Sequence, residues 1–163
     1  TTGDGIAKFG EVVDGRFMGI NYSRAFVAFS DALSSVIPRF AFEAAEKTLM
    51  TINREVPPHT DSNIECVINV YLRTSNCLTQ FYDIEGEPQT FQIENQTDGS
   101  IHKPECLKPA DSFVAKAGEV YLLNVKQPHA VKAQRPGPID RQAICLQSSV
   151  ATYEEVLTWL LQA

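Results

Sequence analysis

The sequence predicts a mainly β fold with flanking helices, a sandwich or barrel and not an alternating β/α fold. Many short segments alternate apolar and polar residues, turn residues separate them, and helical spacing is confined to the two ends of the chain. With 163 residues and 44% hydrophobic content, the chain has the size of one domain that forms its own core. We therefore predict a single domain over residues 1–163, with a support region at 1–47, a β core at 48–147 and a C-terminal helix at 151–162.

The support region is expected to contain a helix. Residues up to 19 are rich in glycine and weakly patterned, whereas residues 23–36 carry apolar side chains at roughly helical spacing. Ser23 is suitably placed to cap the N-terminus of this helix. Residues 26–29 also fit a strand.

The β core begins where the spacing changes to two. Alternation over residues 48–54 ends at Pro57 and Pro58. Over residues 64–72 one face carries Ile68 and the other carries Val67, Asn69 and Tyr71. Further strands are expected at residues 78–84, 90–94, 113–115, 120–125 and 141–147.

A polar segment at residues 83–111 interrupts this pattern, with a hairpin turn signal at Asp98-Gly99. It is either a lid on the substrate side or an ordinary surface hairpin, and its His102 is expected to be a surface residue. The chain then ends in a helix, because Thr152 and Glu155 form a capping box ahead of an apolar stripe.

Charge, the length of apolar segments and cysteine content argue against several classes of function. A formal charge of −6 disfavours binding to nucleic acid. No apolar segment approaches the roughly 20 residues that a membrane span requires. The four cysteines, Cys66, Cys77, Cys106 and Cys145, include no CxxC pair, so we expect free thiols in a reducing compartment and a cytoplasmic location.

One pair of residues suggests a metal site. His59 and Asp61 stand two residues apart and point to the same face if the segment is extended. A third ligand must come from elsewhere, and His129, at a predicted corner between strands, is the candidate. Two histidines and one carboxylate form the facial triad of non-haem iron(II) oxygenases.

An arginine near the end of the core suggests an anion site. Arg141 begins an alternation that it shares with Ala143 and Cys145 on one face. A guanidinium directed into a barrel needs an anionic partner, and its fork suits a carboxylate. Arg141 could instead pair at the rim with a surface acid, and Arg135, in a Pro-Gly-rich loop, is a second candidate for the anion contact.

Together these motifs resemble the iron(II)- and 2-oxoglutarate-dependent oxygenases, especially the small prolyl-hydroxylase-like members. The resemblance covers residues 49–147 and rests on segments 59–61, 67–72, 79–83, 116–119 and 128–131, together with Arg141. Leu78-Thr79 stands where many of those members have Gly-Gly before the threonine. Asp61 separates the chain from related halogenases, and Gln147 replaces a second arginine found in nucleic-acid demethylases.

The resemblance implies a double-stranded β-helix, that is, a cupin-like jelly roll. It implies that His59, Asp61 and His129 hold Fe(II), that Arg141 binds the distal carboxylate of 2-oxoglutarate, and that Tyr71 or Asn69 assists. With O2, such an enzyme hydroxylates a C–H bond and releases succinate and CO2. The substrate is expected to be a peptide or a small amino-acid-like molecule. Alternatives are a cupin-like metal-binding or sensing domain without turnover and a metal oxygenase that uses no keto acid.

Overall fold

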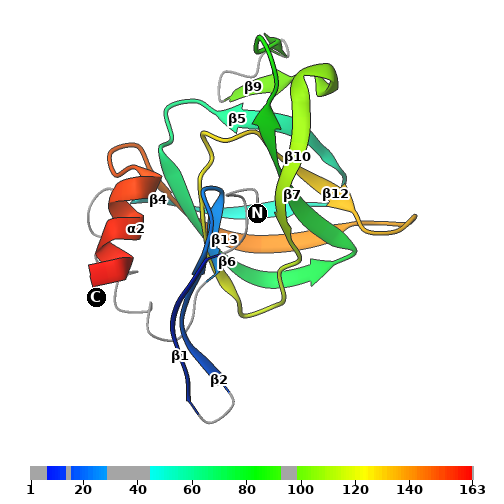
Figure 1. Ribbon diagram of the computed structural model, residues 1–163. Coiled ribbons are helices and arrows are strands. Elements are labelled where there is room, and N and C mark those ends of the chain that lie inside the picture. The colour runs from blue at the N-terminus through cyan, green and yellow to red at the C-terminus, as the bar shows by residue number, and fades with distance from the viewer. Residues whose placement is uncertain (1–6, 14–15, 29–44, 93–98, 163) are drawn as a thin grey trace.

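The computed structural model describes residues 7–13, 16–28, 45–92 and 99–162, which form two facing antiparallel sheets and one helix (Figure 1). In spatial order the larger sheet contains β1 (Ala7–Val13), β2 (Arg16–Tyr22), β3 (Phe26–Ala28), β11 (Val120–Leu123), β6 (Cys66–Ser75), β13 (Asp140–Ser148) and β4 (Ala45–Ile52). The smaller sheet contains β10 (Leu107–Phe113), β7 (Cys77–Ile84), β12 (His129–Ala133), β5 (Val56–Asp61), β9 (Gly99–His102) and β8 (Thr90–Phe91). The predicted mainly β, cupin-like jelly roll is confirmed.

The core between the sheets contains an aromatic cluster. Phe113 from the smaller sheet stacks on Tyr121 from the larger one, with ring centroids 4.0 Å apart. Phe26 packs against Phe113 at 4.8 Å, and Tyr71 is fully buried in the same cluster. Such rings fill much of the space where the sheets meet.

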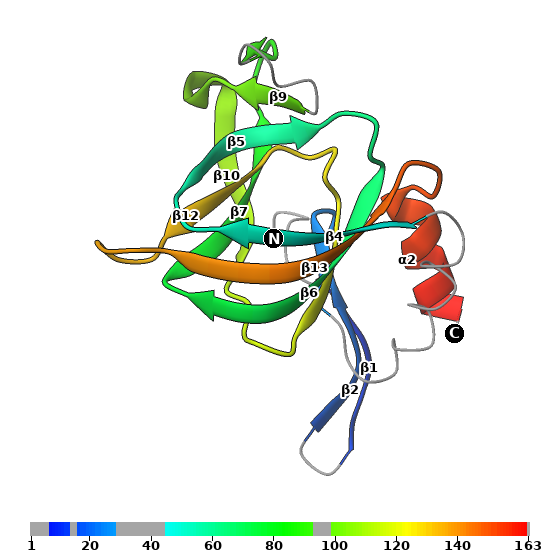
Figure 2. The ribbon, with the colours of Figure 1, turned by 180° about the vertical axis from the view of Figure 1, so that it is seen from behind.

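The predicted C-terminal helix is confirmed as α2 (Tyr153–Gln162), which covers the outer face of the larger sheet (Figure 2). Val156 and Leu160 pack with Ile68, Leu122 and Leu146. The capping box forms, because the Glu155 amide donates to Thr152 Oγ1 at 3.2 Å and the Thr152 amide donates to Glu155 Oε2 at 3.0 Å. No helix among the described residues has the length and apolar character needed to cross a membrane.

The helix predicted at residues 23–36 is wrong where the chain is described. Phe26 and Val27 belong to β3 and are buried in different clusters, Phe26 between the sheets and Val27 beneath α2. A strand buried on both faces loses its alternation, so Phe26 and Val27 show no period of two. Ser23 Oγ accepts from the amides of Ala25 and Phe26, so it caps a turn. Residues 29–36 lie outside the described part of the chain.

Other segments are more ordered than their sequence predicts. Strands β1 and β2, which lie in a weakly patterned part of the sequence, pair as antiparallel neighbours and project from the body (Figure 1). The polar segment at 83–111 contributes β8, β9, the short 3-10 helix Pro104–Cys106 and β10. Here β9 pairs with β5 so closely that a Cβ on Gly99 would lie 2.5 Å from the Thr60 carbonyl oxygen, so only glycine fits. All four cysteines are unpaired and buried.

Candidate metal centre

Two adjacent strands of the smaller sheet carry the candidate ligands. His59 and Asp61 alternate on β5 and point to the same face, as the pattern predicts. His129 begins β12 and is the direct cross-strand partner of His59. Ligand atoms of the three residues all lie within 4.8 Å of one another, so the group could hold a metal ion. The structure therefore brings His129, from a distant part of the sequence, next to the neighbouring pair His59 and Asp61.

Both histidine rings are oriented by backbone carbonyl groups. Nδ1 of His59 lies 2.8 Å from the Pro57 oxygen, and Nδ1 of His129 lies 2.9 Å from the Gln127 oxygen. A carbonyl oxygen can only accept, so each Nδ1 carries the proton and each Nε2 keeps its lone pair. Nε2 of His59 lies 3.5 Å from Asp61 Oδ1. A protonated Nδ1 with a free lone pair on Nε2 is the tautomer that an imidazole needs to bind a metal through Nε2.

The electrostatics of the centre favour a neutral imidazole at His129. Burial, together with the nearby His59, lowers the pKa of His129 to about 3. The two rings are 4.3 Å apart between centroids. A neutral ring can bind a cation without first losing a proton.

The centre opens into a cavity of about 200 Å³ between the two sheets. Most of its wall is apolar, with a few polar groups. The lining residues are Met50, Ile52, Val56, His59, Asp61, Val67, Asn69, Thr79, Leu123, Val125, His129, Val131, Arg141, Cys145 and Gln147. A concave, mostly apolar site with a few converging polar groups is typical of small-molecule binding.

Arg141 lies in this cavity and not at the rim. It is 2% exposed, its Nη2 donates to Thr79 Oγ1 at 2.9 Å, and its Cζ lies 5.3 Å from the centre of the Tyr71 ring. Its Nε is buried and has no hydrogen-bond partner among the described residues. Among the described residues that line the cavity, Asp61 is the only one with a carboxylate. A buried guanidinium with an unused N–H donor is suited to a carboxylate ligand.

Asn69 and Tyr71 extend the polar region next to Arg141. Asn69 lines the cavity, and its Nδ2 lies 3.3 Å from the Tyr71 hydroxyl oxygen, to which it donates. Its Oδ1 is buried and has no partner among the described residues. Burial raises the pKa of Tyr71, so the hydroxyl keeps its proton. Asn69 is thus placed to contact a ligand directly, whereas Tyr71 lies behind Asn69 and Arg141.

Arg135 is excluded as the arginine of the cavity. Its side chain is exposed in the loop between β12 and β13, and it does not line the cavity. Asn76 holds this loop by accepting from the Arg135 amide at 3.0 Å and donating to the Arg135 carbonyl oxygen at 3.0 Å. Of the two arginines that were candidates for the anion contact, Arg141 therefore lies in the cavity and Arg135 does not.

The prediction that His102 is a surface residue is wrong. His102 is 5% exposed, and its Nε2 lies 3.2 Å from Thr60 Oγ1 across the β5–β9 ladder. Burial lowers its pKa, and His59 adds to that effect. Thr60 alternates with His59 and Asp61 along β5, so the His102 contact lies on the opposite face of the strand from the ligands.

Comparison with known proteins adds little to this geometry. No protein family and no curated protein matches the sequence. Similar solved structures include L-ribose isomerase from Cellulomonas parahominis, with L-psicose (12% identity) and with L-ribose (14% identity), each at a TM-score of 0.36 over 81% of this chain and 62% of that one. A mutant L-ribose isomerase from Acinetobacter sp. DL28 in complex with L-ribose has 13% identity and the same TM-score, over 81% of this chain and 60% of its own. The chain thus spans about three-fifths of these neighbours, and its function must be argued from its own side chains.

Proposed function

We propose that this chain is an iron(II)- and 2-oxoglutarate-dependent dioxygenase that hydroxylates a C–H bond of a peptidyl or small amino-acid-like substrate. The observation that carries the proposal is the combination of a two-histidine, one-carboxylate group with a buried, incompletely paired arginine in one cavity. The metal group alone fits a binding or sensing domain equally well. Arg141 is the feature that favours a dicarboxylate co-substrate.

The donor set fits iron(II). Nε2 of His59, Nε2 of His129 and a carboxylate oxygen of Asp61 would hold the ion, and no thiolate belongs to the group. Three ligands on one face leave positions open for other molecules, as in non-haem oxygenases. When bound, iron with O2 and 2-oxoglutarate supplies the oxidising power, and succinate and CO2 are the by-products.

The remaining residues bind, orient and exclude water. Arg141 would pair with the distal carboxylate of the co-substrate, with Thr79 holding one arm of the guanidinium. Asn69 is placed to contact the same molecule. Apolar side chains such as Val125 and Val131 cover much of the wall and limit the access of water.

The first test measures co-substrate binding without turnover. Anaerobic protein loaded with iron(II) is titrated with 2-oxoglutarate, and we expect a visible charge-transfer band. Arg141→Met should weaken binding about a hundredfold, because loss of one partner of a buried ion pair costs about 3 kcal/mol or more. Arg135→Ala is the matched control and should bind as the parent does, because Arg135 lies outside the cavity. Absence of the band in the parent protein would contradict the proposal.

A second measurement separates the proposal from its alternatives. Succinate release is screened over amino acids and proline-containing peptides, with oxygen uptake followed in parallel. Release that depends on a substrate supports the hydroxylase. Bound metal without succinate under any condition indicates a binding or sensing domain. Oxygen uptake in the absence of 2-oxoglutarate indicates an oxygenase in which Arg141 meets the carboxylate of the substrate itself.

A further inference from the structure

Both candidate histidine ligands follow a proline, and both use the carbonyl two residues upstream. In each case the acceptor belongs to the residue before the proline, Pro57 for His59 and Gln127 for His129. A residue before proline is restricted to extended conformations, which fixes the direction of its carbonyl. Pro57 is further restricted by its own ring. Gln127 has no such ring, so its position depends on other contacts.

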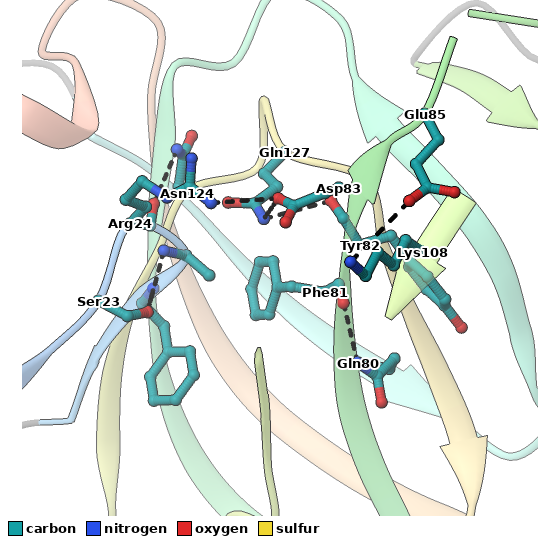
Figure 3. A network of polar contacts seen from close by, with 12 residues as sticks. Ser23, Arg24, Gln80, Phe81, Tyr82, Asp83, Glu85, Lys108, Asn124 and Gln127 are labelled. Carbon is teal, nitrogen blue, oxygen red and sulfur yellow. Dashed lines mark hydrogen bonds and ion pairs between the residues drawn. The ribbon is translucent and has the colours of Figure 1, made fainter. Parts of the chain in front are cut away.

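Those contacts connect Gln127 to the end of β7. Its Nε2 donates to the Tyr82 carbonyl oxygen at 3.2 Å and to Asp83 Oδ1 at 3.4 Å, as Figure 3 shows. The Tyr82 amide in turn donates to the Pro128 carbonyl oxygen at 2.8 Å. The two residues immediately before His129 are therefore both bound to Tyr82.

The other end of the same turn is held by the segment before β3. The Gln127 amide donates to the Asn124 carbonyl oxygen at 3.1 Å, and Asn124 Nδ2 donates to the Arg24 carbonyl oxygen at 3.1 Å. The Arg24 guanidinium lies 3.3 Å from Asp83 Oδ1, the atom that Gln127 also contacts. Through backbone and side-chain groups, Gln127, Asn124, Arg24 and Asp83 thus form a closed circuit of contacts around the turn (Figure 3).

We propose that Gln127 is a positioning residue for the metal centre: its side chain fixes the carbonyl that holds His129 with Nδ1 protonated and Nε2 directed at the metal. The side-chain amide of Gln127 fixes this residue relative to β7. Because only Pro128 separates Gln127 from His129, the position of Gln127 also determines that of the imidazole. The inference rests on the proposed metal site, and it adds a residue outside the cavity lining to the parts on which that site depends.

Gln127→Leu tests the proposal, because leucine keeps much of the bulk and removes the donor. Gln80→Leu is the matched control, since Gln80 is also half-buried and its side chain also donates two hydrogen bonds, here to the Phe81 and Asp111 carbonyl oxygens, without contacting a ligand. Nitrogen-15 NMR of the metal-free protein at neutral pH reports the tautomer of His129. A cobalt(II) titration followed by visible absorption reports the affinity of the site.

Gln127→Leu should reduce the Nδ1–H signal of His129 and weaken cobalt binding by about tenfold or more, the usual cost of losing a partner that orients a ligand. Gln80→Leu should change neither, and Gln127→Lys, which keeps a donor within reach of Asp83, should restore much of both. The proposal is overturned if Gln127→Leu keeps the parent tautomer and affinity, or if Gln80→Leu loses as much. If the parent protein binds no cobalt, the proposed metal centre fails, and the NMR comparison alone decides whether Gln127 sets the tautomer.

Discussion

At the scale of single residues, the sequence predicts the residue types that carry the chemistry of the site but not the contacts that hold them. His59, Asp61, His129 and Arg141 were predictable because these residue types seldom stand on an inward strand face without a partner. Thr79 belongs to segment 79–83, which carries part of the resemblance, but it was assigned no role, although its hydroxyl holds Arg141. Threonine is common in strands, and its position in the sequence does not reveal this contact. Likewise, the partner of His102 is 42 residues away across a ladder, and sequence spacing does not reveal such a contact.

The buried imidazole of His129 predicts an acid-sensitive fold in the metal-free protein. Its pKa is lowered from 6.5 in the unfolded chain to about 3, mainly by burial. The folded state therefore disfavours the proton. Stability from this residue is complete above pH 6.5 and is lost as the pH falls toward 3. We expect the free energy of unfolding to drop by about 2 kcal/mol between pH 6.5 and about 5.

Urea unfolding of the metal-free protein at a series of pH values measures this effect. His129→Gln removes the titrating ring, so the difference in unfolding free energy between the two proteins should shrink as the pH falls. A constant difference over that range would show that His129 does not titrate as its burial requires.

Elements were predictable where one face is buried and the other is exposed. β13 follows this rule, with Arg141, Ala143 and Cys145 turned inward and Ile144 exposed. β3 does not, because both of its faces are covered. β5 contains Pro57 and Pro58, the residues at which the predicted strand over 48–54 was expected to end. It was therefore not predicted as a strand, although an extended conformation was assumed in order to place His59 and Asp61 on one face. Segments of atypical composition become strands because they pair with neighbouring strands, and the local sequence pattern contains no information about those neighbours.

The cap of α2 gives a prediction at the scale of one element. Thr152→Ala removes the hydroxyl that accepts from the Glu155 amide and should cost about 1 kcal/mol, or about 2–4 °C in Tm. Thr158→Ala is the control, because Thr158 is exposed within the same helix and bonds only to the carbonyl oxygen of Glu154. Circular dichroism during heating compares the variants. An equal shift for both would mean that the cap adds nothing beyond local helix preference.

For the whole molecule, the fold brings the turn before β3 and the start of α2 together in a way that no motif predicts. The Tyr153 hydroxyl at the start of α2 donates to the Ser23 carbonyl oxygen at 2.6 Å, across 130 residues of sequence. Both residues are buried. This bond attaches the helix to the turn before β3, next to the segment that supports Gln127.

Tyr153→Phe tests that attachment. It leaves a buried carbonyl without this donor and should lower the free energy of unfolding by about 1–2 kcal/mol, with an unchanged dependence on urea concentration. Urea unfolding followed by fluorescence provides the measurement. Unchanged stability would mean that packing of α2 alone fixes the helix.

The pairing of β5 with β12 is the least regular junction in the smaller sheet. Only His59 with His129 and Val56 with Val131 are matched, and the register shifts between them, whereas β12 and β7 match over five consecutive pairs. Beyond β5 the sheet continues to β9 and β8. An ion bound by β5 on one side and β12 on the other is a cross-link at the place where the ladder supplies few bonds. Loss of such an ion should loosen β5, β9 and β8 together, so that metal occupancy would govern the rigidity of this edge of the sheet.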